Sequence, residues 1–209
     1  MELIDKKSIN YVEDYLHLGL PRQVETMLII EVDGLPEAVE AESDIISRVC
    51  WQTGSMDFTI AHDAMEADRI WQARRAVSPA IARASHAKIG EDICVPRSAI
   101  PAMVRQIIKI EKRFGLPIVI FGHAGDGNLH PNILFNPYDS KQVESAESAV
   151  GAIFDAAIKL GGTLSGEHGI GLTKKPFLYF GLSPPAISLM RAVKKAIDPA
   201  NKFLWRNRK

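Results

Sequence analysis

Two histidines flank an Asp-Gly pair in the segment 121–131, FGHAGDGNLHP. Asp-Gly is a favoured two-residue turn of a β-hairpin, so the segment predicts two antiparallel strands joined at Asp126 and Gly127. With these residues at the centre of the turn, His123 falls directly opposite His130, and their Cβ atoms would lie roughly 4.5 to 5.5 Å apart. Two imidazoles at that separation can bind one metal ion. The alternative is that both are surface residues and that the glycines serve only the turn.

A second glycine-rich segment, GTLSGEHGIG at 162–171, places an acid and a histidine side by side after an expected helix. Glu167 can complete a set of two histidines and one carboxylate, which leaves coordination positions open for water or substrate. His168 could stay uncoordinated and act as a general base near neutral pH. An exposed polar turn is the alternative for this segment by itself, but the two segments together favour a metal site. The chain contains no His-Glu-x-x-His motif, which disfavours a zinc peptidase of that type.

These segments lie within a repeating pattern of strands and helices. Apolar runs and turn signals predict strands at 24–32, 56–60, 91–96, 118–121 and 129–135. Apolar spacing by threes and fours predicts helices at 35–51, 70–84, 101–114, 143–160 and 183–198. Pro79 lies inside the second helix, where proline kinks or divides it. The short link between the last two strands requires an antiparallel pair, so we expect an α+β fold: a ferredoxin-like antiparallel sheet with helices packed on one face, plus a C-terminal helical segment.

Composition excludes several classes of partner. The 25 basic and 25 acidic side chains give a formal net charge of +0, which removes the electrostatic case for nucleic acid or an anionic membrane. A small-molecule partner is therefore expected. Cys50 and Cys94 resemble buried apolar residues more than a disulfide framework, and no stretch approaches the roughly 20 apolar residues of a transmembrane helix, so we expect a cytoplasmic protein. The basic end, with Arg206, Arg208 and Lys209, is assigned no role.

The two glycine-rich motifs, GHAGDGNLHPN at 122–132 and GGTLSGEHGIGLTKKPFL at 161–178, resemble the FAD-linked oxidase family with a C-terminal cap domain. This family includes the large flavoprotein subunit of glycolate oxidase, D-lactate dehydrogenase and D-2-hydroxyglutarate dehydrogenase, and the chain looks most like the first. Further matching pieces are MELIDKKSI at the start, IWQARRA at 70–76, KIGEDICVPRS at 88–98 and MRAVKKAIDPANKF at 190–203.

The resemblance implies a role for each residue singled out above. His123, His130 and Glu167 would hold a divalent metal, such as zinc, manganese or iron, that contacts the carboxylate and 2-hydroxyl oxygens of a substrate. His168 would take the hydroxyl proton while the C2 hydride passes to FAD. The implied reaction is the oxidation of a 2-hydroxy acid, of the glycolate or D-lactate type, to a 2-oxo acid.

The resemblance also implies substrate binding by Arg74, Ser78 and Asn132. Arg74 and Ser78 are four residues apart on one helix face, and a guanidinium suits bidentate binding of a carboxylate. Asn132 shares a strand face with His130. The alternative for Arg74 is a solvated helix charge, because the adjacent Arg75 could equally point inward.

Two positions depart from the family pattern. Some relatives place a substrate-binding lysine where this chain has Gly90, so that role is not carried over, and Lys88 is only a substitute candidate. The usual Asn-Pro-Gly-Lys ending is replaced by LWRNRK at 204–209, which puts docking of the tail onto the flavin domain in question.

Nothing in residues 1–209 resembles the FAD-binding domain that precedes this region in the family, and no GxGxxG fingerprint is present. We therefore expect 1–209 to be a single cap, or substrate, domain that is inactive by itself and needs an FAD-binding domain or subunit. An exposed apolar face that normally meets that domain predicts self-association into a homo-oligomer. The alternatives are a binding module without turnover and, third, a metal hydrolase.

Overall fold

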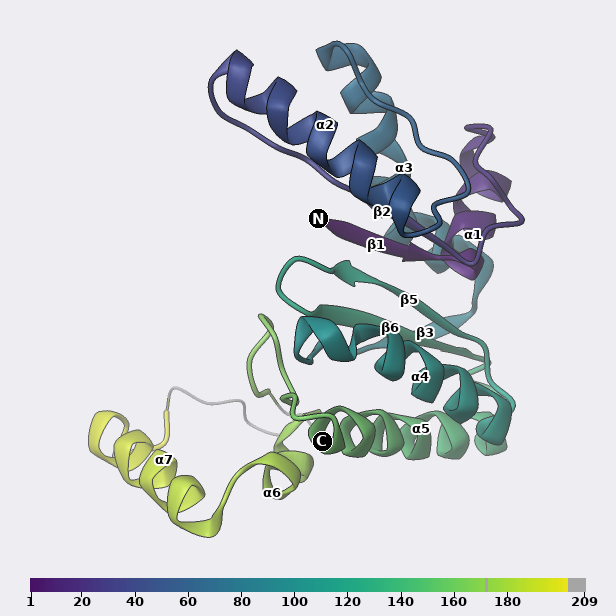
Figure 1. Cartoon of the computed structure of the whole chain (residues 1–209). Coiled ribbons are helices and arrows are strands. Elements are labelled where there is room, and N and C mark those ends of the chain that lie inside the picture. Colours follow the sequence, from purple (N-terminus) through teal and green to yellow (C-terminus); the bar gives the residue numbers. More distant parts are fainter. Residues whose placement is uncertain (172, 203–209) are drawn as a thin grey trace. The chain divides into compact units, whose positions relative to one another are not determined.

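The computed structural model describes residues 1–171 and 173–202, and the chain forms two compact units, Met1–Ile81 and Ala82–Lys209. The first unit contains β1 (Glu2–Asp5), α1 (Lys6–Leu16), β2 (Thr26–Ile29), α2 (Pro36–Gln52) and most of α3 (Ala64–Ala84) (Figure 1). β1 and β2 pair antiparallel, with Ile4 opposite Met27. Asp5 caps α1, because its Oδ1 accepts a hydrogen bond from the backbone N–H of Ser8 at 2.8 Å.

The predicted helices of this unit are confirmed, but one predicted strand is wrong. Residues 56–60 form no strand. The backbone groups there form hydrogen bonds with nearby side chains instead. Ser55 Oγ donates to the carbonyl oxygen of Asp57, and Asp57 Oδ1 accepts from the N–H of Phe58. Such local bonds compete with a strand ladder. α3 continues through Pro79 without division, and β1 and α1 were not among the predicted elements.

The second unit is built on an antiparallel sheet. Its strands are β3 (Ala87–Gly90), β4 (Ile93–Cys94), β5 (Ile118–His123) and β6 (Asn128–Phe135). β6 lies between β5 and β3 and also pairs with β4. The helices α4 (Ile100–Phe114) and α5 (Ser140–Lys159) lie side by side on one face of this sheet, with the short 3-10 helix η1 (Arg97–Ala99) before α4 (Figure 1). The predicted α+β fold with an antiparallel sheet and helices on one face is confirmed. Of the strand expected at 91–96, only Ile93–Cys94 (β4) forms a strand, and β3 lies before this range.

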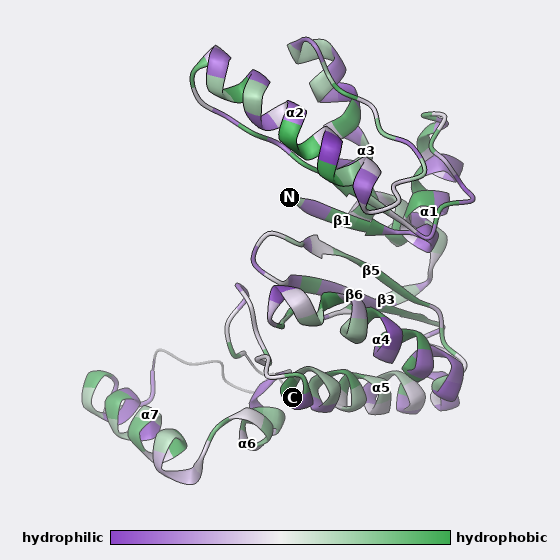
Figure 2. Cartoon of the chain, viewed as in Figure 1, coloured by the Kyte–Doolittle hydropathy of each residue, from purple (hydrophilic) through white to green (hydrophobic). Residues whose placement is uncertain are grey.

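The core of this unit follows from the two-residue period of its strands. One face of β5 and β6 carries Ile118, Ile120, Leu129 and Ile133, each at most 2% exposed. Figure 2 shows the apolar character of this region, and the helices contribute a matching set of buried side chains, namely Met103, Ile107, Ile153 and Phe154. The opposite face carries His123, His130 and Asn132. The first face therefore packs against the helices, and the opposite face combines these three polar residues with the buried apolar residues Val119, Phe121 and Leu134.

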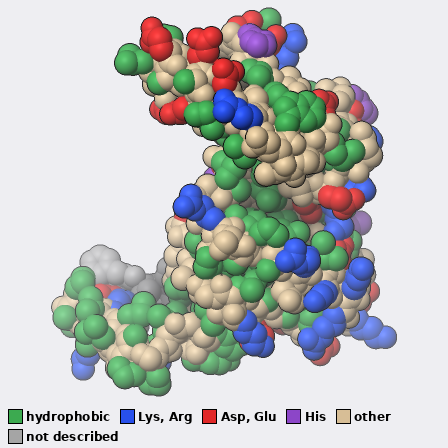
Figure 3. All heavy atoms as spheres, in the orientation of Figure 1, with side chains coloured by type: hydrophobic (Ala, Val, Ile, Leu, Met, Phe, Trp, Pro, Cys, Tyr) green, Lys and Arg blue, Asp and Glu red, His purple; other side chains and the backbone are tan. Residues whose placement is uncertain are grey.

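Three further helical elements follow the sheet: η2 (Lys175–Phe177), α6 (Leu178–Gly181) and α7 (Pro184–Ile197). Ser183 and Pro184 begin α7 as predicted, with Ser183 in extended conformation and Pro184 at the first helical position. No residue of α7 is buried, and Figure 3 shows hydrophobic side chains gathered over it.

The expectations for the basic end at 204–209 lie outside the described residues. Within the described ranges, no helix has the length and apolar character needed to span a membrane.

Candidate functional site

The hairpin of β5 and β6 places the two histidines by a different register from the one predicted. His123 pairs with Asn128, and Phe121 pairs with His130. The predicted two-residue turn is wrong, because four residues, 124–127, connect the strands. The N–H of Gly127 donates to the carbonyl oxygen of His123 at 3.1 Å, which closes this longer turn. The register moves by two residues, and because side chains alternate with a period of two, both histidines still share one face.

The two imidazoles are therefore diagonal neighbours on the sheet, with ring centroids 5.3 Å apart. His130 is buried, whereas the side chain of His123 is 34% exposed. The turn is held from outside the hairpin, because the N–H of Val95 donates to the carbonyl oxygen of Gly127 at 3.0 Å. Gly127 has a φ of +84°, in the left-handed region that favours glycine.

The loop after α5 brings Glu167 to the histidines. Backbone hydrogen bonds between Thr163 and Cys94 tie the start of this loop to β4. Glu167 Oε1 lies 3.4 Å from His130 Nε2, and Glu167 Oε2 lies 3.7 Å from His123 Nε2. One ligand atom from each of the three residues lies within 4.8 Å of the others. Two imidazole nitrogens and one carboxylate oxygen at this spacing fit a single divalent ion, with positions left open for other ligands.

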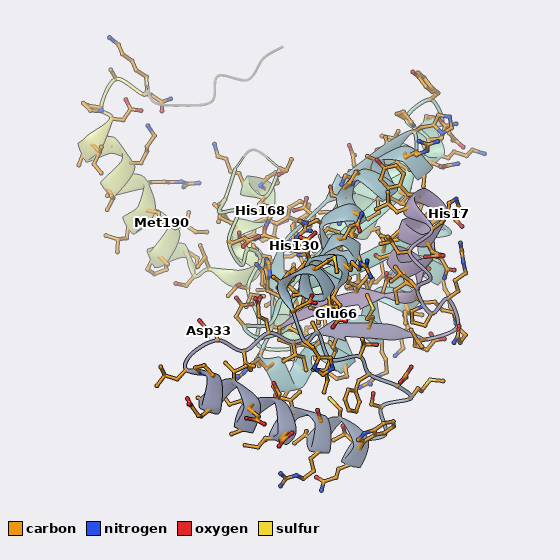
Figure 4. All side chains as sticks on the ribbon, turned by 90° about the horizontal axis from the view of Figure 1, so that it is seen from above. His17, Asp33, Glu66, His130, His168 and Met190 are labelled. Atoms are coloured by element: carbon orange, nitrogen blue, oxygen red, sulfur yellow. The ribbon has the colours of Figure 1, made fainter. Side chains whose placement is uncertain are left out.

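His168 lies beside this group of three donors. Its ring stacks on that of His130, with centroids 5.5 Å apart and an interplanar angle of 19°, and Figure 4 shows the two labelled side chains close together. Nε2 of His168 is 3.7 Å from Glu167 Oε1, and its side chain is 55% exposed. The side chain is thus adjacent to the candidate ion site and accessible to a molecule bound there, so it can serve as a proton-transfer group.

Asn132 lies on the same strand face as His130, as predicted. Its Nδ2 donates to the carbonyl oxygen of His130 at 2.9 Å, and the residue is buried. Gly90 pairs with Asn132, and a Cβ at position 90 would lie 2.8 Å from Asn132 Oδ1. Glycine at this position therefore leaves room for the asparagine amide. Lys88 is two residues earlier on β3, and burial lowers the pKa of its ammonium group.

Of the two adjacent arginines, Arg74 is the inward one. Its Nε lies 2.6 Å from Glu2 Oε2, and its side chain is 16% exposed. Arg75 is exposed and pairs with Asp68 at 2.6 Å. Ser78, one helical turn after Arg74, is exposed. Substrate binding by Arg74 and Ser78 stays a prediction.

Sequence reasoning missed two buried charged residues behind the loop, Asp92 and Lys174. Asp92 accepts hydrogen bonds from three consecutive loop N–H groups, and Lys174 Nζ bonds to its carbonyl oxygen at 2.8 Å and to its carboxylate. A second acid, Glu91, lies 3.8 Å from Lys174 Nζ. The available signal was the acidic pair Glu91-Asp92 inside an apolar strand, because buried acids require partners.

Replacing Glu91 with glutamine is expected to make folding stability depend less on pH. Burial raises the pKa of Glu91, opposed by the charges of Lys174 and His168. A raised folded-state pKa means that ionised Glu91 costs folding free energy above both pKa values, and that the cost vanishes below the unfolded value of about 4.3. Glu91→Gln should therefore raise the urea midpoint at neutral pH, with a difference that shrinks as pH falls. A lower midpoint for the variant at neutral pH would contradict this.

The family model described as "FAD linked oxidases, C-terminal domain" matches residues 1–204. The chain belongs to this family. Glycolate oxidase subunit GlcD of Bacillus subtilis (strain 168) is 39% identical over 201 residues, which are 96% of this chain and 43% of that protein. The "Probable D-lactate dehydrogenase, mitochondrial" of Danio rerio is 30% identical, covering 96% of this chain and 40% of that protein. The chain thus spans less than half the length of these relatives.

A solved structure shares the fold. 4-ethylphenol oxidase from Gulosibacter chungangensis, in an isoeugenol complex, superposes with a TM-score of 0.61 at 11% identity, over 95% of this chain and 45% of that chain. At this identity the likeness concerns the fold alone. It agrees with an FAD-linked oxidase C-terminal domain.

Proposed function

We propose that this chain is the metal- and substrate-binding domain of an FAD-dependent 2-hydroxy acid dehydrogenase of the glycolate or D-lactate type. The observation that carries the proposal is the donor set of His123, His130 and Glu167 with His168 beside it, in a chain of the FAD-linked oxidase family. In this proposal, 1–209 is a single cap domain. It oxidises the 2-hydroxy acid to a 2-oxo acid only with an FAD-binding domain or subunit, to which the C2 hydride passes.

Each residue of the proposed site has a separate role. His123, His130 and Glu167 would hold a divalent ion such as zinc, manganese or iron, which polarises the 2-hydroxyl and lowers its pKa. Nε2 of His168 accepts the hydroxyl proton, because it faces the Glu167 side of the group. Asn132 offers its amide from the same strand face as His130.

Arg74 and Ser78 are also proposed to bind the substrate. The Arg74 guanidinium, already paired with the carboxylate of Glu2, is of the type that binds a substrate carboxylate in bidentate fashion. Ser78 offers a hydroxyl one helical turn away. Assays with glycolate and with D-lactate would measure which substrate side chain these residues accept.

Reconstitution tests this function. The chain would be mixed with the FAD-binding part of the Bacillus subtilis relative, with glycolate or D-lactate and an artificial electron-accepting dye. We expect dye reduction only when both proteins are present. His168→Ala should lower the rate by roughly 100-fold or more, the usual share of a general base, whereas exposed His62, mutated to alanine, should leave the rate unchanged. Hydroxy acid binding without dye reduction would favour a binding module instead.

Self-association is a separate prediction that rests on α7. Leu189, Met190, Val193 and Ile197 are between 48% and 73% exposed and lie on one side of this helix. We expect this stripe to pair with a second copy when no FAD-binding domain covers it. Sedimentation at micromolar concentration should show a dimer or larger species, and Leu189→Glu with Val193→Glu should shift it to monomer. Tyr138→Glu, an exposed position outside the stripe, is the control. A strictly monomeric unmutated chain would contradict the prediction.

A further inference from the structure

The backbone of the loop that carries Glu167 and His168 converges on one buried oxygen atom. Asp92 Oδ2 accepts hydrogen bonds from the N–H groups of Gly166, Glu167 and His168 at 2.8, 2.7 and 2.9 Å. The hydroxyl of Ser165 donates to the same atom at 3.1 Å. Consecutive N–H groups that converge in this way form a concavity for an anion. The side chain of Asp92 is 0% exposed, so the loop backbone encloses a buried carboxylate.

Asp92 also belongs to the sheet that carries the histidines. Gly90 pairs with Asn132 and Ile93 pairs with Leu129, so the two registers along β6 are continuous. This continuity places Asp92 opposite His130. Asp92 therefore lies beside the strand that carries one proposed ligand, and its carboxylate bonds to the loop that carries another.

Lys174 supplies the counter-charge. Its Nζ contacts the Asp92 carboxylate and donates to the Asp92 carbonyl oxygen at 2.8 Å, and its side chain is only 4% exposed. Buried charges persist when they are paired and hydrogen-bonded, and removing one partner leaves the other uncompensated. An ionised Asp92 only accepts hydrogen bonds, which is what three N–H donors and a hydroxyl require.

The same carboxylate faces the ring of His168. Asp92 Oδ1 lies 3.5 Å from Nδ1 of His168, while Nε2 points toward Glu167. A carboxylate beside one ring nitrogen favours the tautomer with the proton on that nitrogen. Both nitrogens face an acid, but Asp92 is nearer and fully buried whereas Glu167 is half exposed, so Asp92 favours the proton on Nδ1. The other nitrogen then carries the lone pair, which is the form a general base needs.

We propose that Asp92, paired with Lys174, is the positioning residue of this site: it orients the loop backbone so that Glu167 reaches the two histidines, and it holds His168 with Nδ1 protonated and Nε2 available. The inference rests on the proposed function for the roles of Glu167 and His168. It adds two residues, 82 positions apart in the chain, to which no role was assigned from the sequence.

Asp92→Asn is the decisive substitution, with Asp198→Asn as a matched control. Asp198 is also a buried acid that pairs with a lysine, Lys194, and accepts a backbone N–H, that of Lys202 at 2.7 Å. Zinc binding by the 209-residue chain would be measured by calorimetry. Asp92→Asn should weaken it by roughly 10- to 100-fold, the usual effect of losing a partner that orients a ligand. Asp198→Asn should leave it unchanged.

Two readouts on the zinc-free chain separate positioning from bulk stability. Nitrogen-15 NMR of the imidazoles should show Nδ1–H for His168 in the unmutated chain and in Asp198→Asn, and Nε2–H in Asp92→Asn. Amide hydrogen exchange at residues 166–168 should be faster in Asp92→Asn alone. An unchanged tautomer together with unchanged exchange would overturn the proposal.

The double variant Asp92→Asn with Lys174→Met covers the case in which the single variant fails to fold. It removes the uncompensated buried ammonium, so folding should recover while the tautomer of His168 stays altered. Recovery of both zinc affinity and the Nδ1–H tautomer would show that Asp92 serves only as the charge partner of Lys174, and would overturn the proposal. If the unmutated chain binds no zinc, the proposed metal role fails, yet the two zinc-free readouts still decide the positioning role.

Discussion

His130→Ala and Glu167→Ala are each expected to abolish stoichiometric binding of a divalent ion by this chain. Each contributes one of three donor atoms that lie within 4.8 Å of one another. Loss of a direct ligand should exceed the roughly 10- to 100-fold that loss of an outer partner costs. Metal analysis after dialysis against limiting zinc or manganese would measure the content directly.

His62→Ala is the matched control for these variants, because it removes an exposed histidine that belongs to a different part of the chain. It should retain the full metal content. His130 is buried, so its removal also needs a folding check by circular dichroism. Unchanged metal content in both His130→Ala and Glu167→Ala would contradict the proposed metal site.

Gly127→Ala should destabilise the chain more than Gly115→Ala, the same change at the end of α4. Gly127 has a φ of +84°, and a Cβ there would lie 1.9 Å from the backbone carbonyl oxygen of Val95. A left-handed backbone costs a non-glycine residue about 1 to 2 kcal/mol, and overpacking adds typically about 1 to 3 kcal/mol. We expect a loss of about 3 kcal/mol in the free energy of unfolding, measured with urea.

Gly115→Ala separates the two causes of this loss. Gly115 ends α4 with a φ of +67°, but no atom lies within 4 Å of a Cβ built there. It therefore reports backbone strain alone, and about 1 kcal/mol is expected. If Gly127→Ala cost no more than Gly115→Ala, the contact between the turn and Val95 would be unimportant. Because the same turn sets the spacing of His123 and His130, Gly127→Ala should also weaken metal binding.

The hairpin illustrates how far the sequence could predict the site. The apolar runs at 118–121 and 129–135 predict both strands, because a run of apolar residues bounded by turn residues is a local signal for a buried strand. The register was wrong because the turn depends on Val95, a residue of a separate segment that bonds to Gly127. The wrong register still placed His123 and His130 on one face, because side chains alternate with a period of two and a shift of two residues keeps each side chain on its face.

Asp92 and Lys174 show where prediction from the sequence stops. An acid within a strand is equally typical of an exposed edge, and nothing local indicates a lysine 82 residues later. The strand expected at 56–60 failed for a related reason: its residues alternate adequately, but Ser55 and Asp57 bond to the local backbone. His123, His130 and Glu167 could be predicted because their residue types and glycine-rich surroundings are informative by themselves.

The close approach of Gly90 to Asn132 makes these two positions epistatic. Any side chain at position 90 begins 2.8 Å from Asn132 Oδ1, and the amide is buried and bonded to the carbonyl oxygen of His130. A lysine at position 90 would require the Asn132 amide to turn away from its present orientation. The side chains that positions 90 and 132 accept are therefore coupled: a larger residue at position 90 is tolerated only with a different orientation of the Asn132 amide, which would give up its hydrogen bond to His130.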